Sequence, residues 1–131
     1  MKFHHIGYIV SNLENSIKGF NNLGYNPSPV YIDNFQEIEI VILTKNNFPT
    51  IELIKPSFDN HPLNRYKNKL QYSNPYHLAF QTKSILKEIK VLRSSRFIPT
   101  MKISKAVAFN DVPFIFLLEK HVGIIELLEI K

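Results

Sequence analysis

The sequence contains no cysteine. Disulfide bonds, catalytic thiolates and zinc sites built from cysteine are therefore excluded. No apolar run approaches the ~18 residues that a membrane-spanning helix needs, and the first residues lack the apolar segment of a signal peptide. A basic tail, a helix-turn-helix pattern and the aromatic motif of RNA-binding sheets are also missing. These absences predict a soluble, cytoplasmic protein with neither a membrane nor a nucleic acid as its partner.

The residues that are present describe a folded domain of ordinary size. Hydrophobic residues make up 44% of the 131-residue chain, which is enough for a core and argues against disorder. The length corresponds to about one domain. The net charge of +5 comes from scattered lysine and arginine residues, as is typical of a solvated surface. Such a charge would also suit an anionic substrate or a phosphate tail.

The chain contains an internal repeat. Segments 3–10 (FHHIGYIV) and 76–81 (YHLAFQ) both resemble strands with a histidine near the start. A shift of 72 residues places His5 on His77, and it also matches Tyr8 with Phe80, Leu13 with Ile85, Ile17 with Ile89, Phe20 with Leu92, Tyr25 with Phe97, and Pro27 with Pro99. Both copies end in Ile-Glu-Leu, where the shift from Glu52 to Glu126 is 74, so we expect two inserted residues in the second copy.

The first copy is predicted to be a βαβββ module. Its strand at 3–10 precedes a helix at about 12–22, whose apolar residues follow helical spacing. Ser11 is the expected N-cap, with Glu14 completing a capping box. Gly24 is the expected stop because glycine enters the left-handed conformation without a Cβ clash. Strands are then expected at 37–43 and 50–54.

The second copy repeats this order. A strand at 76–81 leads to a helix at 84–95, capped by Thr82 or Ser84. The later extended segments are expected at 97–99, 105–109, 113–118 and 124–130. Module one therefore covers residues 1–56, a polar connector covers 57–74, and module two covers 75–131. The fold class that follows is α+β.

Two histidines and two glutamates occupy matching places in the two copies: His5, Glu52, His77 and Glu126. If a pseudo-twofold axis relates the copies, all four side chains can meet at one point. Histidine and carboxylate are ligands for zinc, nickel, cobalt, iron and manganese. Either glutamate alone would be interpreted as a solvent-facing strand residue. The repetition of both residue types favours a metal site over that reading, and over a duplicated sheet that serves only as scaffold.

The other histidines have no counterparts. His4 lies beside His5 but alternates to the opposite face of the strand. His61 falls in the connector and His121 in a turn. We therefore interpret these three as ordinary structural or surface residues.

Five segments carry a resemblance to a known family: 3–10, 13–17, 51–56, 76–80 and 123–127. They resemble the vicinal oxygen chelate superfamily (glyoxalase, bleomycin resistance and dioxygenase proteins), and most closely the methylmalonyl-CoA epimerase-like and glyoxalase I-like members. The resemblance implies a single domain over 1–131, in which two tandem βαβββ modules form a half-barrel mixed sheet around a metal site. It implies His5, Glu52, His77 and Glu126 as ligands of one divalent ion, which would be zinc, nickel, cobalt or manganese.

The resemblance also implies an activity. A metal-dependent isomerase or lyase of this type stabilises an enolate on its metal while a glutamate moves a proton alpha to a carbonyl or thioester. Similar epimerases carry a glutamate base before the third strand, where this chain has Phe35. The candidate catalytic residues are therefore the ligands Glu126 and Glu52, as in glyoxalase I-like enzymes. The implied substrate is a small molecule such as an acyl-CoA or a thiol conjugate.

Other branches of the family define the alternative. Extradiol dioxygenases leave open the ligand position that Glu52 fills, which argues against that branch. Antibiotic-sequestering members lack the ligands, yet a non-catalytic small-molecule binding or resistance protein on the same fold stays the competing hypothesis because the epimerase-type base is missing. Apolar, exposed strand edges predict a homodimer in either case.

Overall fold

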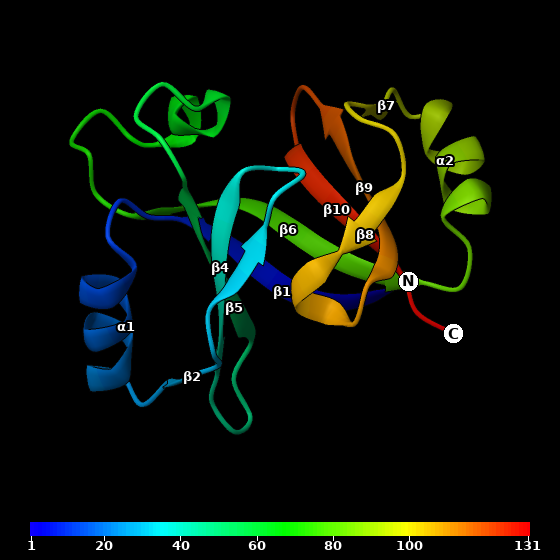
Figure 1. The fold of residues 1–131 in the computed structure, drawn as a ribbon. Coiled ribbons are helices and arrows are strands. Elements are labelled where there is room, and N and C mark those ends of the chain that lie inside the picture. Colours follow the sequence, from blue (N-terminus) through cyan, green and yellow to red (C-terminus); the bar gives the residue numbers. More distant parts are fainter. The chain divides into compact units, whose positions relative to one another are not determined.

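The computed structural model describes residues 1–131. The chain divides into two compact units, one of residues 5–76 and one of residues 1–4 with 77–131. Each unit contains one copy of the repeat, with one α-helix beside strands of an open sheet (Figure 1). No helix is long and apolar enough to cross a membrane. That the whole chain forms one domain, with modules at 1–56 and 75–131, stays a prediction.

The unit of residues 5–76 contains a mixed sheet. Its strand order is β2-β4-β5-β1, and β3 pairs with β4. β5 runs parallel to β1 and antiparallel to β4. The elements are β1 (Lys2–Ile9, whose first residues belong to the other unit), α1 (Leu13–Asn22), β2 (Asn26–Pro27), β3 (Tyr31–Asp33), β4 (Ile38–Thr44), β5 (Thr50–Pro56) and the 3-10 helix η1 (Pro62–Tyr66).

One face of this sheet packs against α1. Val41 and Leu43 of β4 alternate onto that face, and so do Ile51 and Leu53 of β5, where all four are buried. The apolar stripe of the helix covers them with Leu13, Ile17 and Phe20. Because neighbouring strand residues point to opposite faces, Glu52 lies on the face turned away from α1.

The ends of α1 show one wrong prediction and one confirmed prediction. The N-cap is Asn12 rather than Ser11, and its Oδ1 accepts a hydrogen bond from the Asn15 N–H at 2.9 Å. Asparagine caps as well as serine, so the residue one step later takes the role and the helix begins at Leu13. Gly24 ends the helix as predicted, with a φ of +92°.

The strands of the other unit also run in mixed directions. Its strand order is β6-β10-β9-β7, and β8 pairs with β9. β10 runs parallel to β6 and antiparallel to β9. The elements are β6 (Asn74–Thr82), α2 (Ile85–Arg93), β7 (Ile98–Pro99), β8 (Ser104–Ala106), the 3-10 helix η2 (Val107–Phe109), β9 (Val112–Glu119) and β10 (Gly123–Glu129).

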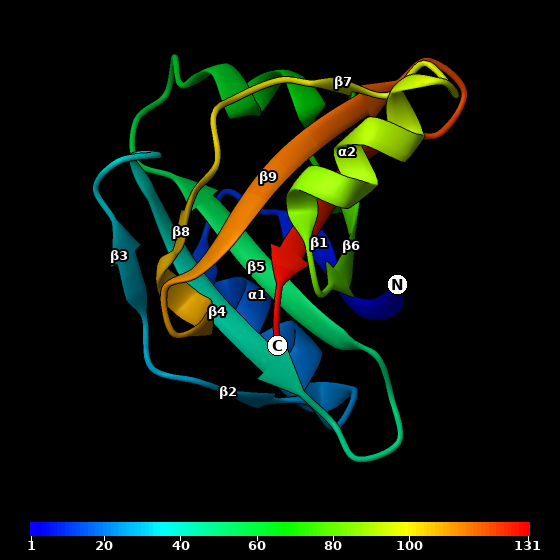
Figure 2. The same ribbon diagram turned by 90° about the vertical axis from the view of Figure 1, so that its right-hand side faces the viewer.

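α2 covers one face of the strands of this unit (Figure 2). Ser84, one of the two predicted alternatives, is the N-cap, and its side chain accepts a hydrogen bond from the Lys87 N–H. The Glu129 carboxylate accepts another from the Ile85 N–H at 2.9 Å. Ile85, the first residue of this helix, is fully buried against the sheet. The sheet residues that surround it are Ile115, Leu117, Ile125 and Leu127, packed by Ile89, Leu92 and Phe97.

The two helices end in the same hydrogen-bond pattern. In α1 the Tyr25 N–H donates to the Phe20 carbonyl at 3.1 Å, and in α2 the Phe97 N–H donates to the Leu92 carbonyl at 3.2 Å. This bond closes a Schellman-type cap around a left-handed residue. Arg96, with a φ of +69°, occupies the position of Gly24. The sequence shift of 72 residues is therefore also a structural equivalence.

The two extra residues of the second copy enter at two places. The shift is still 72 at Pro27 and Pro99, which lie in β2 and β7. It is 73 at Asp33 and Ala106, each of which pairs with the first residue of the next long strand. It reaches 74 from Glu52 to Glu126. One residue is thus added between β7 and β8, and one between β8 and β9.

The segment predicted at 105–109 is not one element. β8 ends at Ala106, and Val107–Phe109 forms a 3-10 turn that leads into Asn110, whose φ is +57°. The extra residue before β9 requires this tighter path, which an apolar sequence pattern alone does not reveal. The predicted α+β fold of two βαβββ modules with mixed sheets is confirmed.

Candidate functional site

His5 and Glu52 meet within the unit of residues 5–76. The parallel register pairs His5 with Thr50 and Gly7 with Glu52, so the two side chains lie on the same face of adjacent strands. The His5 Nε2 atom is 3.3 Å from the Glu52 Oε1 atom. Both residues are buried, and both lie on the face away from α1.

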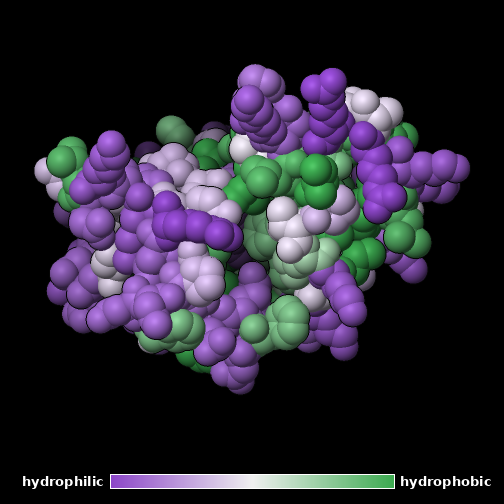
Figure 3. Space-filling view, turned by 90° about the horizontal axis from the view of Figure 1, so that it is seen from above, coloured by the Kyte–Doolittle hydropathy of each residue, from purple (hydrophilic) through white to green (hydrophobic).

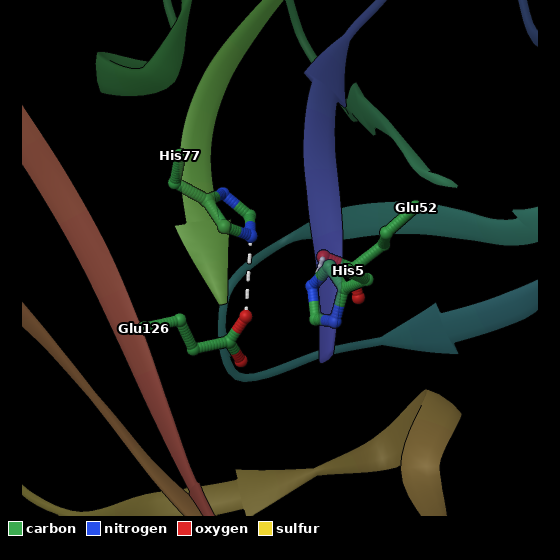
Figure 4. A group of neighbouring side chains, drawn as sticks. All are labelled: His5, Glu52, His77 and Glu126. Carbon is green, nitrogen blue, oxygen red and sulfur yellow. Dashed lines mark ion pairs between the residues drawn. The ribbon is translucent and has the colours of Figure 1, made fainter. Parts of the chain in front are cut away.

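His77 and Glu126 form the equivalent pair in the other unit. The register pairs His77 with Ile124 and Ala79 with Glu126. The His77 Nε2 atom is 3.1 Å from the Glu126 Oε2 atom, as the dashed line in Figure 4 marks. The His77 ring also packs edge-on against Phe116, with 5.1 Å between the ring centroids.

A small residue stands beside each glutamate. Gly7 is the strand partner of Glu52, and Ala79 is the partner of Glu126, so these residues are equivalent under the 72-residue shift. A larger side chain there would occupy the same face between the histidine and the glutamate. This pair of small residues was not among the residues predicted from the sequence. Its signal is the His-X-Gly or His-X-Ala spacing in both first strands.

Burial distinguishes these four residues from ordinary strand glutamates and histidines. His5, Glu52, His77 and Glu126 are each no more than 5% exposed. A carboxylate taken out of water is costly unless positive charge or hydrogen bonds compensate it. The reading of the two glutamates as solvent-facing strand residues is therefore wrong.

The remaining histidines lie elsewhere. His4 packs edge-on against the Phe109 ring at 4.9 Å. His61 caps η1: its Nδ1 accepts from the Leu63 N–H, so its Nε2–H donates to the Gln36 carbonyl at 2.7 Å. His121 is exposed in the turn before β10. The His5 and His77 rings each contact a glutamate.

The position expected for an epimerase base carries no acid. Phe35 lies in the turn between β3 and β4 and is 77% exposed. Of the nearby glutamates, Glu37 is exposed in the same turn, with a φ of +56°. Glu39 pairs with Lys55 at 3.1 Å, and both alternate onto the α1 side of the sheet. Neither glutamate lies on the sheet face that carries Glu52.

A family model matches most of the chain. Residues 4–116 match the model described as glyoxalase/bleomycin resistance protein/dioxygenase superfamily. The matched range includes His5, Glu52 and His77 and ends ten residues before Glu126. No curated protein matches the sequence significantly.

Solved structures share the fold at low sequence identity. Methylmalonyl-CoA epimerase from Mycobacterium tuberculosis matches with a TM-score of 0.82 and 20% identity, over 97% of this chain and 86% of that one. A hypothetical protein from Bacillus halodurans matches with 0.81 and 19%, over 99% and 94%. A methylmalonyl-CoA epimerase variant from Streptomyces coelicolor, in complex with 2-nitronate-propionyl-CoA, matches with 0.79 and 15%, over 98% and 96%. These likenesses show the predicted half-barrel fold.

Proposed function

Because the chain belongs to the glyoxalase/bleomycin resistance protein/dioxygenase superfamily, we propose that it is a metal-dependent isomerase or lyase that moves a proton alpha to a carbonyl or thioester. The proposed ligands of one divalent ion are His5, Glu52, His77 and Glu126. The observation that supports this most is the repetition of a buried histidine–glutamate contact at equivalent positions in both units.

The donor set suits a divalent ion. Two imidazoles and two carboxylates, all buried, are a combination of residues that could hold a metal. Two ligand atoms that each lie about 2.1 Å from an ion are roughly 3.0–3.4 Å apart in octahedral or tetrahedral sites. The Nε2–Oε distances within the pairs are 3.3 and 3.1 Å. Zinc, nickel, cobalt and manganese accept such nitrogen and oxygen ligands.

A divalent ion held here would supply Lewis-acid chemistry, polarising a substrate oxygen and stabilising an enolate. Proton transfer falls to the chain itself. Glu39 is held by Lys55 on the other face of the sheet, and Glu37 is exposed. The carboxylates of Glu52 and Glu126 are thus the proposed bases that take the proton. Each is positioned by a contact with a histidine on the adjacent strand.

The strand positions around both pairs are apolar. Ile42 is the strand partner of Glu52, and Phe116 is the partner of Glu126. No lysine or arginine occupies the strand positions on either ligand-bearing face. We therefore propose a substrate with an apolar group next to the reacting carbon, carried as an acyl-CoA or a thiol conjugate. The neighbours described as methylmalonyl-CoA epimerases support the thioester class.

Metal content tests the ligand assignment. Protein without an affinity tag, dialysed against zinc, nickel, cobalt or manganese, should retain one ion per chain with at least one of them. His5→Ala and His77→Ala should each lose most of that ion, because each removes one of four ligands. His121→Ala is the matched control and should bind as the wild type does. Equal metal content in all four proteins would contradict the assignment.

Deuterium exchange from solvent tests the activity. The metal-loaded protein should exchange the α-proton of at least one acyl-CoA thioester or thiol conjugate. Glu52→Gln and Glu126→Gln keep the side-chain shape but remove the base, and the variant that lacks the true base should lose about 10²–10⁴-fold in rate. An unchanged exchange rate in both variants would exclude both glutamates.

The second candidate is a non-catalytic small-molecule binding or resistance protein. The observation that favours it is the exposed Phe35 at the place where similar epimerases carry their base. On this reading the metal-loaded protein binds thioesters or thiol conjugates, as measured by calorimetry, but exchanges no α-proton. The same substrate panel therefore separates the two candidates.

We further propose a homodimer. Ile98 of the edge strand β7 pairs with Leu118 of β9, and both are exposed, by 66% and 44%. Val122, in the turn after β9, is 56% exposed. Apolar side chains also gather in patches on the face shown in Figure 3. Sedimentation equilibrium should give twice the chain mass, and Ile98→Lys should shift the population toward monomer. The cytoplasmic location stays a prediction.

A further inference from the structure

A cavity lies in the unit that contains α2, apart from the histidine–glutamate pair. It forms where the first residues of β1, the end of β6, the start of α2 and the segment after β10 come together. Its volume is about 370 Å³. Its polar lining consists of Lys2, Lys83, Lys131, Gln81, Thr82 and Glu88.

The charge of this cavity is positive. Its three lysines form no ion pair within the chain. The only lining acid, Glu88, accepts a hydrogen bond from the Thr82 hydroxyl at 3.0 Å. Nearby Glu129 does not line the cavity, and its carboxylate accepts the Ile85 N–H. Three ammonium groups against one carboxylate attract an anion.

Packed residues separate this cavity from the metal-ligand pair of the same unit. Gln81 follows His77 by four residues on β6, which is about 13 Å along a strand. Ala79, Leu128 and Phe114 form a buried cluster on the face between them, and none is more than 1% exposed. These packed residues close the direct path from the cavity to His77 along this face.

We propose that this cavity binds a diphosphate-bearing small organic molecule. Lysine ammonium groups bind phosphate oxygens as point charges, and three of them suit two adjacent phosphates better than one. The Gln81 amide adds a donor. The volume falls in the range of ligand pockets rather than single-ion sites. Met1 and Ile130 add apolar contact area for the organic part.

Calorimetric titration with ADP, coenzyme A and inorganic diphosphate tests this proposal. We expect ADP or coenzyme A to bind more tightly than inorganic diphosphate, with an affinity that falls as salt is raised. Binding of ADP but not of coenzyme A would identify the ligand as a free nucleotide. Binding of both would identify the diphosphate that they share as the recognised group. No binding of any, or no preference over inorganic diphosphate, would overturn the proposal.

Variants locate the binding. Lys83→Ala should weaken it by about tenfold or more, since one charge-assisted contact is lost, and Glu88→Gln should strengthen it. Lys120→Ala, an exposed lysine in the turn at the opposite end of β10, is the matched control and should change affinity less than about twofold. Equal losses in Lys83→Ala and Lys120→Ala would show only diffuse charge attraction and overturn the site. Binding should persist in His77→Ala, which separates this site from the proposed activity.

Discussion

The two units keep the same histidine–glutamate pair but surround it differently. In the first unit, the strand partner of Glu52 is Ile42, and in the second the partner of Glu126 is Phe116. Phe116 also packs edge-on against the His77 ring. The residues that contact one another in each pair are the same in both units, while the strand partners of the two glutamates differ. The proposed site therefore has an aliphatic neighbour in the first unit and an aromatic neighbour in the second.

The largest effect is expected from the two equivalent cores. Leu53 and Leu127 are both fully buried, beside Glu52 and Glu126 in sequence. Leu53→Ala and Leu127→Ala should each lower the free energy of unfolding by about 2–5 kcal/mol, because each leaves a cavity. Urea unfolding followed by circular dichroism measures both. A loss below about 1 kcal/mol in one of them would show that its core repacks and that the units are not energetically equivalent.

The helix caps should differ in strength. The Asn12 cap contact is 2.9 Å, while the Ser84 Oγ lies 3.4 Å from the Lys87 N–H, and Glu129 already satisfies the Ile85 N–H. Asn12→Ala should cost about 1 kcal/mol, and Ser84→Ala should cost less. Asn12→Ser keeps the cap and serves as the control. A larger loss for Ser84→Ala, measured by the same unfolding experiment, would reverse this order.

The ring contacts of Phe116 give a third comparison. Phe116 contacts the rings of His77 and Phe114, at 5.1 and 5.6 Å between centroids. Phe116→Leu should lose about 0.5–1.5 kcal/mol of aromatic pairing and should shift the NMR resonances of the His77 ring. Ile42→Leu is the matched change in the first unit and should leave the His5 resonances nearly unchanged. Similar shifts for both histidines would contradict the asymmetry.

The last comparison concerns the helix C-termini, where the smallest single effect is that of Arg96→Gly. Gly24 and Arg96 hold the same left-handed position, which costs energy for a residue with a Cβ. Arg96→Gly should therefore raise stability by about 0.5 kcal/mol, and Gly24→Ala should lower it by about 1 kcal/mol. In Gly24→Ala the Lys45 side chain must also move, since its Cε would lie 3.1 Å from the new Cβ. Melting temperatures that move in the same direction would contradict this prediction.

Much of the fold could be predicted because the duplication doubles every signal. The histidine at the start of each first strand, and the Ile-Glu-Leu of each last strand, predicted the pairs that the structure brings to 3.3 and 3.1 Å. Details decided by one side chain were less predictable. Ser11 and Asn12 are both good caps, and only the helix geometry selects Asn12. The 3-10 turn at 107–109 likewise depends on where an inserted residue fits between β8 and β9.

The order of residues was enough to predict the repeat, its βαβββ order and the paired histidines and glutamates, because period and register are visible along the chain. Which glutamates are buried depends on how the strands pair. Glu39 and Glu52 lie in similar alternating apolar stretches, but strand pairing turns Glu39 toward Lys55 and Glu52 toward His5. The tertiary structure also brought Lys2, Lys83 and Lys131 to one cavity from three distant segments. These contacts between residues that are distant in the sequence depend on the register between strands, which no local sequence pattern encodes.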